Sequence, residues 1–337
     1  MSSSLESVAA AMVAPGKGIL AADEGDSTIV NRFDSIGVES TETNRRAYRQ
    51  LLFTTPNIEQ FISGVILFDE TLRQTSDDGT PFPQLLLDRG IIPGAKVDTG
   101  TVPLAGFPGE QITIGLDDLR QRVGHYRDLG AQFGKWRAVI AVGPGLPTSA
   151  CIDAQAHGLA RYAALCQEGG LVPIVEPEVL MDGDHTIERC AQITEAALAA
   201  VFNALHHHRV RLEGIVLKPS MVLSGKECPH RAGVEEVAQA TLDVFRRTIP
   251  AAVPGIAFLS GGQGPQEATA HLNAMNTIGG NPWELSFSYG RALQQPVLKA
   301  WAGEAANTKR AQQAFYLRAQ CNSAARTGSY NQQMEAA

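Results

Sequence analysis

The sequence predicts an α/β fold in which a single (β/α)8 TIM barrel is followed by extra C-terminal helices. Three observations support this prediction. Eight short apolar runs have the length of buried strands, amphipathic helical segments separate most of them, and polar side chains follow several of the runs directly. A doubly wound sheet is the alternative fold. Because no Pro/Gly/Ser linker divides the chain, we expect one domain over residues 1–337, with a polar tail from about residue 326.

The expected strands are rich in Val, Ile, Leu and Ala, and in chain order they are residues 18–22, 63–68, 91–97, 136–142, 171–175, 214–217, 255–259 and 283–287. The expected helices are residues 41–52, 116–129, 149–168, 186–206, 234–247, 267–275, 292–301 and 308–324. The polar residues 23–27, which follow the first strand, are expected to form its loop. This alternation of strand and helix favours a closed parallel barrel.

Composition excludes several classes of function. The formal net charge of -7 argues against nucleic acid or an anionic membrane as the main partner. No run approaches the roughly 18 apolar residues of a spanning helix, and residues 1–18 lack the basic start of a secretory signal, so we expect a cytoplasmic protein. The five cysteines and eight histidines show no metal-ligand spacing, so no metal and no cofactor are expected.

The stretch at residues 214–219 contains the strongest chemical signal. Three apolar residues typical of a buried strand are followed by Lys218 and then by Pro219, which cannot donate to a sheet ladder. The amine therefore stands at the carboxyl end of a strand, where α/β barrels build their sites. There it is a candidate Schiff-base nucleophile if its surroundings lower its pKa. The alternative is a lysine whose stem extends from the strand end to solvent.

Lysine is scarce in this chain, and its placement is informative. Only seven of the 28 basic residues are lysines, and three of these, Lys96, Lys135 and Lys218, lie in apolar, strand-like segments. Burying an ammonium is unfavourable unless it is paired or neutral, so a shared purpose is expected for these three. Lys135 precedes its apolar run, which predicts that a long stem must bring its amine from the start of a strand to the centre.

Carboxylates and anion-binding loops are expected at the same end of the barrel. Asp23 and Glu176 follow apolar strands directly, and Glu178 shares the face of Glu176 if the strand alternation continues through Pro177. Helix capping or solvation is as good a reading for Asp26, Asp69 and Glu70. The loops Ser260–Gly262 and Ser288–Arg291 offer hydroxyls, free backbone N–H groups and one guanidinium, which suit a phosphate, although ordinary turns are an alternative. A second anion is expected at Arg32, Lys96 and the hydroxyls of Ser27 and Thr28.

Seven segments together resemble the class I fructose-1,6-bisphosphate aldolase family. They are residues 19–24 (ILAADE), 64–68 (GVILF), 135–137 (KWR), 175–178 (VEPE), 217–219 (LKP), 259–263 (LSGGQ) and 287–293 (FSYGRAL). The match is collinear from about residue 18 to residue 330. The resemblance implies reversible, metal-independent cleavage of fructose 1,6-bisphosphate into dihydroxyacetone phosphate and glyceraldehyde 3-phosphate. It also implies a place in glycolysis and gluconeogenesis and assembly as a homotetramer.

The resemblance further implies a role for each matching residue. Lys218 would form the Schiff base, Glu176 would serve as general acid and base, and Asp23 would take the proton from the hydroxyl next to the breaking bond. Lys135 would stabilise developing oxyanions and lower the pKa of Lys218, with Glu178 positioning that pair. The remaining residues would hold the two phosphates: Ser260, Gly261, Gly262, Ser288, Gly290 and Arg291 at one end, and Arg32, Lys96, Thr28 and Arg137 at the other.

Two departures from the family pattern leave questions open. Many members end in a tyrosine that exchanges the proton of the enamine, whereas this sequence ends at Ala337 without one. Tyr330 is not expected to take over this role, so Glu176 or a water molecule is the expected proton donor. Residues 25–28 also differ from the Ser-Thr-Gly-Ser order of animal members.

Sedoheptulose 1,7-bisphosphate and fructose 1-phosphate are alternative substrates, and a non-catalytic scaffold that binds sugar phosphates is the alternative from another class.

Overall fold

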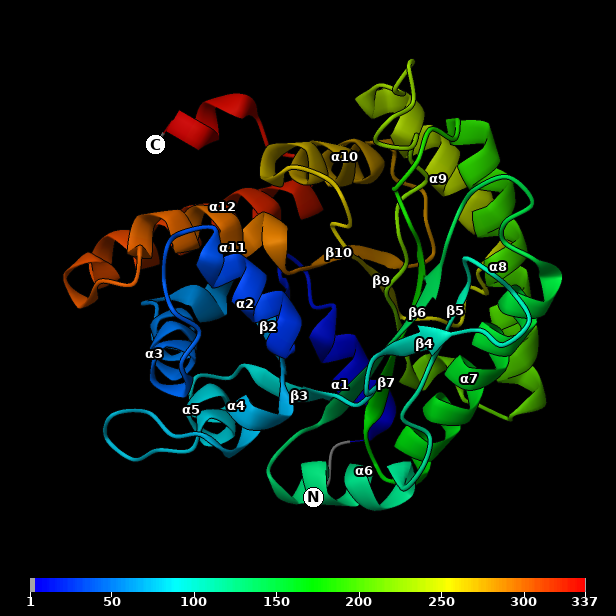
Figure 1. Ribbon diagram of the computed structural model, residues 1–337. Coiled ribbons are helices and arrows are strands. Elements are labelled where there is room, and N and C mark those ends of the chain that lie inside the picture. Colours follow the sequence, from blue (N-terminus) through cyan, green and yellow to red (C-terminus); the bar gives the residue numbers. More distant parts are fainter. Residues whose placement is uncertain (1–3, 337) are drawn as a thin grey trace.

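Eight parallel strands close into a barrel, which confirms the predicted fold (Figure 1). The computed structural model describes residues 4–336. The strands, in their order around the barrel, are β1 (Gly18–Ala22), β10 (Glu284–Tyr289), β9 (Gly255–Phe258), β8 (Val216–Leu217), β7 (Val172–Val179), β6 (Phe133–Ile140), β3 (Ile92–Lys96) and β2 (Ile62–Leu67). The two missing numbers belong to a separate antiparallel pair, β4 (Thr101–Pro103) and β5 (Gln111–Thr113).

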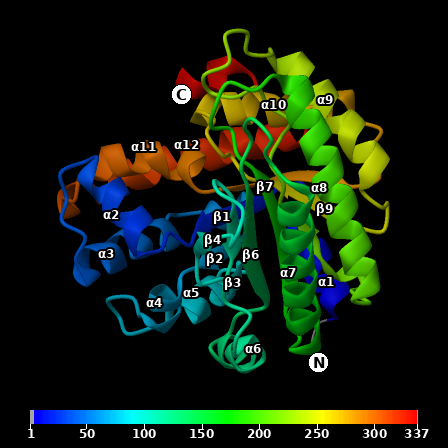
Figure 2. The same cartoon turned by 45° about the vertical axis from the view of Figure 1, so that its right-hand side comes forward.

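Helices surround this barrel, and Figure 2 shows α7 and α8 standing side by side against it. The helices are α1 (Leu5–Met12), α2 (Asp26–Asp34), α3 (Glu42–Phe53), α4 (Asp69–Arg73), α5 (Phe82–Asp88), α6 (Leu119–Asp128), α7 (Ser149–Glu168), α8 (Ile187–His207), α9 (Val234–Thr248), α10 (Pro265–Ile278), α11 (Arg291–Trp301) and α12 (Thr308–Arg326). Four short 3-10 turns add η1 (Ile58–Gln60), η2 (Leu212–Gly214), η3 (Ala305–Asn307) and η4 (Gln332–Ala336). Among residues 4–336, no helix combines the length and apolar character needed to cross a membrane.

Local sequence signals explain where several helices begin. Thr41, Thr148 and Thr186 precede α3, α7 and α8, and each hydroxyl accepts a hydrogen bond from a backbone N–H in the first turn of its helix. These caps place the starts of the three helices within one residue of the predicted ones. The short helices α1, α2, α4 and α5 were not predicted, and α2 begins at Asp26, inside the segment expected to be a loop.

Two strands differ from their predicted bounds in a way that matters for the site. β6 begins at Phe133, so Lys135 is its third residue and pairs in register with Lys96 of β3 and Ile174 of β7. The expectation that Lys135 lies at the start of a strand is therefore wrong. β7 was expected to end at residue 175, but it continues through Pro177 to Val179. The very short β8 does not pair with this last part of β7, so the missing N–H of Pro177 interrupts no ladder on that side.

The barrel interior is packed with apolar side chains beneath the site. Ile19, Ile66, Phe133, Ile174 and Val216 form one buried cluster with Val8, Ala9 and Met12 of α1, so α1 closes the amino-terminal end of the barrel. At the other end of the chain, η4 folds back: Arg318 of α12 is buried and pairs with Glu335. Tyr330 lies half-buried against the outer core in the segment predicted to be a polar tail.

The fit of the Phe133 ring makes one glycine in β3 sensitive. A Cβ added at Gly94 would overlap three ring atoms of Phe133. We expect Gly94→Ala to lower the free energy of unfolding by about 1–3 kcal/mol through overpacking. Thermal and urea unfolding measure this, and a second change, Phe133→Leu, should restore part of the loss.

Gly124 of α6 is the matched control. A Cβ there meets no atom within 4 Å, and the residue lies inside a helix. Gly124→Ala should raise stability by about 0.5–1 kcal/mol. Equal melting temperatures for the Gly94 and Gly124 variants would contradict the tight packing of Gly94 against the Phe133 ring.

Candidate active site

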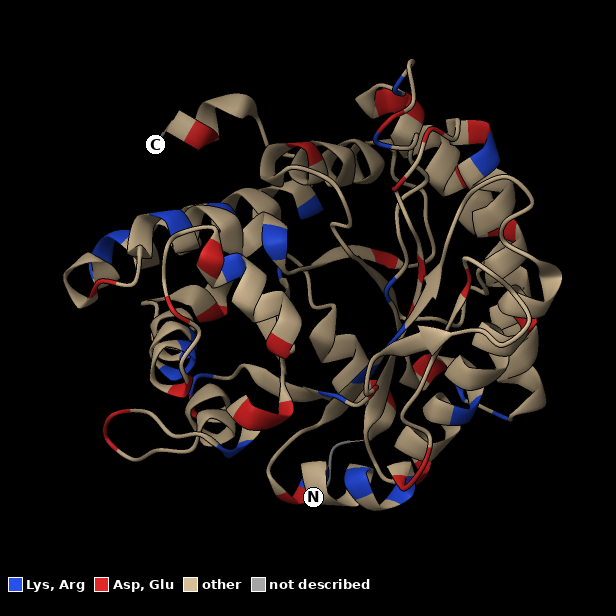
Figure 3. Ribbon diagram, in the orientation of Figure 1, with Lys and Arg blue, Asp and Glu red and all other residues tan. Residues whose placement is uncertain are grey.

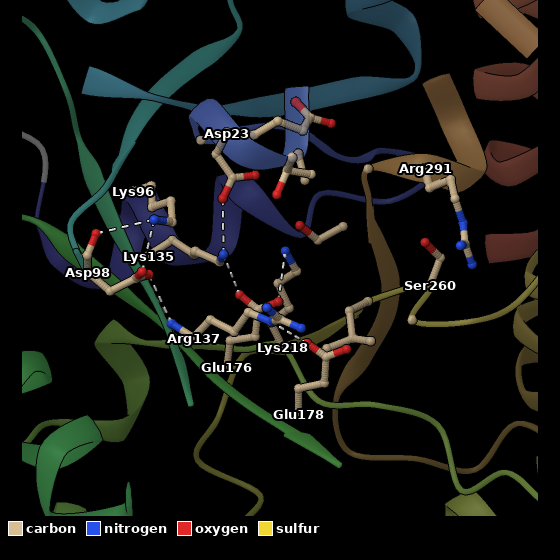
Figure 4. A pocket seen from close by; sticks show the side chains of 18 of the residues that line it. Asp23, Lys96, Asp98, Lys135, Arg137, Glu176, Glu178, Lys218, Ser260 and Arg291 are labelled. Carbon is tan, nitrogen blue, oxygen red and sulfur yellow. Dashed lines mark hydrogen bonds and ion pairs between the residues drawn. The ribbon is translucent and has the colours of Figure 1, made fainter. Parts of the chain in front are cut away.

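A cleft of about 450 Å³ opens at the carboxyl ends of the strands, and Figure 3 shows basic (blue) and acidic (red) ribbon segments close together in the middle of the barrel. Every residue predicted to belong to the site lines it: Asp23, Thr28, Arg32, Lys96, Lys135, Arg137, Glu176, Glu178, Lys218, Ser260, Gly261, Gly262, Ser288, Gly290 and Arg291. These positions come from seven of the eight barrel strands or from the segments directly after them. Figure 4 shows the charged side chains from β1, β6, β7 and β8 pointing toward one another across the cleft.

Glu176 is the centre of a buried cluster of charges. Its carboxylate lies 3.3 Å from Nζ of Lys218 and 3.0 Å from Nζ of Lys135. The Lys135 amine also donates to Asp23 Oδ2 at 3.0 Å. Lys218 and Glu176 are each only 3% exposed. Two amines and two carboxylates thus share one desolvated space, where charges interact strongly.

The pKa of Lys218 is lowered, and the cause is mainly burial. Desolvation disfavours the ammonium; Glu176 opposes this effect, while the positive charge of Lys135 adds to it. For Lys135 the balance is reversed: burial is overcome by Asp23 and Glu176, and its pKa is raised. The cleft therefore contains one lysine held as a cation and one lysine biased toward the free amine.

Asp23 remains ionised despite its burial. Desolvation raises its pKa, but the charges of Lys135 and Lys218 and the hydrogen bond from Lys135 outweigh it and hold the pKa well below the usual range. The carboxylate is therefore available as a proton acceptor at neutral pH.

Glu178 does not make the contact that was expected of it. It pairs with Nε of Arg137, and among the described residues no ion pair joins it to Lys135 or Lys218. The physical reason is position along the strands, because Arg137 stands two residues beyond Lys135 on β6 and Glu178 stands two residues beyond Glu176 on β7. Burial opposes the charge of Arg137, but Glu178 outweighs it and raises the pKa of Arg137.

The loops after β9 and at the end of β10 have the features of an anion site. Gly261 is closely packed, since an added Cβ would lie only 2.7 Å from Leu259 Cδ1. Gly262 has a φ of +44°, which favours glycine. The Ser288 hydroxyl is buried with no hydrogen-bond partner among the described residues. Within the described residues 4–336, Arg291 donates only to the Gln263 carbonyl, at 3.3 Å, so most of its guanidinium is available for an anion.

The other expected cations are already paired with carboxylates. Lys96 lies 2.9 Å from Asp98, and Arg32 lies 3.1 Å from Glu24. Arg32 was expected to bind the same anion as Lys96. In the structure its Nη2 lies near Gly290, at 3.5 Å from where a Cβ on that glycine would be. Arg32 therefore stands close to the loop of Arg291. Thr28 is exposed in the first turn of α2.

Sequence reasoning missed four polar residues that support the cleft: Glu24, Arg49, Asp98 and Gln294. Glu24 and Asp98 carry a usable signal, because each lies directly beside a strand end. Arg49 and Gln294 lie on helices and carry none, since their burial depends on tertiary packing. Across residues 4–336, no group of three or more His, Cys, Asp and Glu side chains is arranged to hold a metal ion.

Fold and cleft together define a (β/α)8-barrel enzyme whose centre is built around lysine amines. The family model described as fructose-bisphosphate aldolase class-I matches residues 4–337. The chain belongs to the class I fructose-bisphosphate aldolase family. Its activity is that of the family, the reversible cleavage of fructose 1,6-bisphosphate into dihydroxyacetone phosphate and glyceraldehyde 3-phosphate, and the predicted enzyme class is confirmed.

Bacterial, plant and protozoan relatives agree with this assignment. A probable class 1 aldolase of Xanthomonas campestris pv. campestris is 58% identical over 327 residues, which cover 97% of this chain and 98% of that protein. A cytosolic aldolase of Arabidopsis thaliana is 56% identical, covering 94% of this chain and 88% of that protein. The solved Plasmodium falciparum aldolase has a TM-score of 0.96 at 48% identity, covering 97% of this chain and 95% of that one.

The shared carboxylate predicts how the two lysines are coupled. Lys135→Met removes a positive charge that lowers the pKa of Lys218, so that pKa should rise. The borohydride-trapped adduct of dihydroxyacetone phosphate should then form with its pH profile moved to higher pH. At neutral pH its rate should fall by about 10²-fold.

Lys299→Met, a change at an exposed lysine of α11, is the control and should leave the profile unchanged. A profile for Lys135→Met that matches wild type or moves to lower pH would contradict the coupling.

Proposed function

We propose that Lys218 is the Schiff-base nucleophile of the aldolase reaction. The observation that carries this proposal is its burial beside Glu176, with the Lys135 cation sharing the same carboxylate. The free amine would attack the substrate ketone and form a carbinolamine. Glu176, having taken a proton from the Lys218 ammonium as the free amine forms, would return that proton to the departing hydroxyl so that water leaves and an iminium forms.

Asp23 is proposed as the base for carbon–carbon cleavage. It would take the proton from the hydroxyl next to the breaking bond, and the bonding electrons would move into the iminium to give an enamine. The aldehyde product forms on the hydroxyl carbon and leaves. Protonation and hydrolysis of the enamine then release dihydroxyacetone phosphate and restore the amine. The contact of Asp23 with Lys135 supports this role, because it keeps the carboxylate ionised until the substrate arrives.

Lys135 and Glu178 are proposed to act through charge. Lys135 would stabilise the oxyanion that develops on the substrate and keep Lys218 partly neutral. Glu178 would act indirectly, because it holds the Arg137 guanidinium at the cleft wall. Tyr330 is not proposed for enamine protonation: its hydroxyl donates to Glu335 at 3.0 Å, and it does not line the cleft.

The two phosphates are proposed to bind at opposite sides of the lysine cluster. Ser260, Gly261, Gly262, Ser288, Gly290 and Arg291 would hold one of them. Lys96, Thr28 and Arg137 would hold the other, with Arg32 transferred to the first set because of its position beside Gly290. The Ser288 hydroxyl, which has no hydrogen-bond partner within residues 4–336, and the position of Arg32 beside Gly290 support this division.

We also propose that the whole chain forms one barrel domain, that the enzyme is a cytoplasmic homotetramer, and that it works without metal. The cytosolic names of plant relatives support the compartment. The exposed Val102 and Ile114, on and directly after the β4–β5 hairpin, support a face covered by another subunit. Light scattering on the purified protein measures the number of subunits, and a monomer would refute the tetramer.

Covalent trapping tests the nucleophile. Borohydride added with dihydroxyacetone phosphate should reduce an imine on Lys218, which peptide mapping by mass spectrometry locates. Lys218→Met should fold, fail to trap and lower kcat by about 10⁴-fold or more. Label on another lysine would defeat the assignment.

Chelator tests the metal-free proposal in the same assay. Activity and trapping should be unchanged after dialysis against chelator, because an iminium serves as the electron sink. The control is a metal-dependent aldolase treated alongside, which should lose activity. Strong inhibition of this enzyme, reversed by added zinc, would point to metal chemistry instead.

A further inference from the structure

Glu24 lies next to Asp23 in the chain but belongs to a different network. Its buried carboxylate accepts from Arg49 Nη2 at 2.7 Å and from the Gln294 amide at 2.7 Å, and it lies 3.1 Å from Arg32 Nη1. Burial opposes the charge of Glu24, but the two guanidinium groups outweigh it and lower its pKa. One carboxylate is therefore held by side chains from α2, α3 and α11.

Arg49 stands behind the cleft wall. It is 3% exposed, does not line the cleft and lies on the buried face of α3. The Gln294 amide fixes the same point from the other side, because it also donates to the Ala21 carbonyl at 2.7 Å. Glu24 consequently has little freedom to move.

Arg32 is the guanidinium of this network that faces the cleft, which Glu24 also lines. Its side chain is 19% exposed, and its Nη2 lies beside Gly290, next to Arg291. A carboxylate shared by two guanidinium groups neutralises only part of the charge of each. Arg49 therefore allows Arg32 to be held in place by Glu24 while it keeps positive charge for an anion.

We propose that Arg49 is a positioning residue that sets the affinity of the β9–β10 loops for a substrate phosphate, acting through Glu24 on Arg32. Without Arg49, Glu24 would be a full counter-ion to Arg32 and would compete with the phosphate for its guanidinium. The inference rests on the phosphate site of the proposed function, but it can be tested by binding alone.

Arg49→Met tests the inference: Glu24 retains Arg32 and the Gln294 amide as partners, and the further hydrogen bond lost is that of Arg49 Nη1 with Gln294 Oε1 at 3.4 Å. Inorganic phosphate binding to the intact enzyme, measured by calorimetry, should weaken by about tenfold. KM for fructose 1,6-bisphosphate should rise by a similar factor while kcat stays within about twofold. Arg49→Lys keeps the charge and should recover most of the affinity.

The double variant decides whether Arg32 carries the effect. In an Arg32→Met background, the change at Arg49 should alter phosphate binding by less than about twofold, because its target is gone. Arg45→Met is the matched control: Arg45 lies one turn earlier on α3, pairs with Glu70 at 2.5 Å and is outside the cleft. It should leave phosphate binding and KM at the wild-type value.

Several results would overturn the proposal. Arg49→Met with a lower melting temperature but unchanged phosphate binding and KM would make the residue merely structural. If Arg49→Met weakened phosphate binding equally in the presence and absence of Arg32, action through Arg32 would be excluded. If Arg49→Met does not fold, an Arg49→Lys enzyme with wild-type stability and a tenfold loss of phosphate affinity would also contradict it, because its charge is retained. Failure of Lys218 trapping in the wild type would refute the proposed function without changing these binding results.

Discussion

The carboxylate of Glu176, shared between two buried amines, is the contact on which the active site depends. An isolated ammonium in this space would be strongly disfavoured, and an isolated carboxylate equally so. With Asp23 completing the set, two amines face two carboxylates, and Lys135 is held as a cation. Lys218 has the weaker contacts, so the carboxylates offset less of the effect of burial and its pKa is lowered. The two lysines share one cavity, but because they differ in their carboxylate partners their pKa values are shifted in opposite directions.

The closed barrel supplies the geometry for this contact. Side chains on a strand alternate, so Ile174 lies in the apolar interior and Glu176, two residues later, lies in the cleft. The same alternation places Phe133 below Lys135 on the neighbouring strand. Apolar packing in the barrel interior therefore fixes the position of each charged side chain along the barrel axis. A shift of one residue in either strand would remove these charges from the cleft.

Much of this site could be predicted from the sequence because strand ends are visible there. An apolar run followed by a lysine and a proline indicates Lys218, and a run followed by an acid indicates Asp23 and Glu176. Strand register is not visible in the same way: Phe133 and Gly134 read as a connection, so Lys135 was expected at a strand start, whereas the structure places it third in β6. Contacts that depend on helix packing, such as Arg49 with Glu24, have no sequence pattern at all.

The charge balance of the cleft has a consequence for substrate binding. Six basic and five acidic side chains line it, and most of the cations are already paired with carboxylates, so the site is close to neutral before substrate arrives. A bisphosphate carries up to about four negative charges, which is more than the guanidinium of Arg291 alone can balance. At the proposed phosphate sites, cations such as Lys96 and Arg32 would therefore exchange or share their carboxylate partners when the phosphates bind. The preformed ion pairs would hold these cations near the proposed phosphate positions and so reduce the conformational freedom lost on binding.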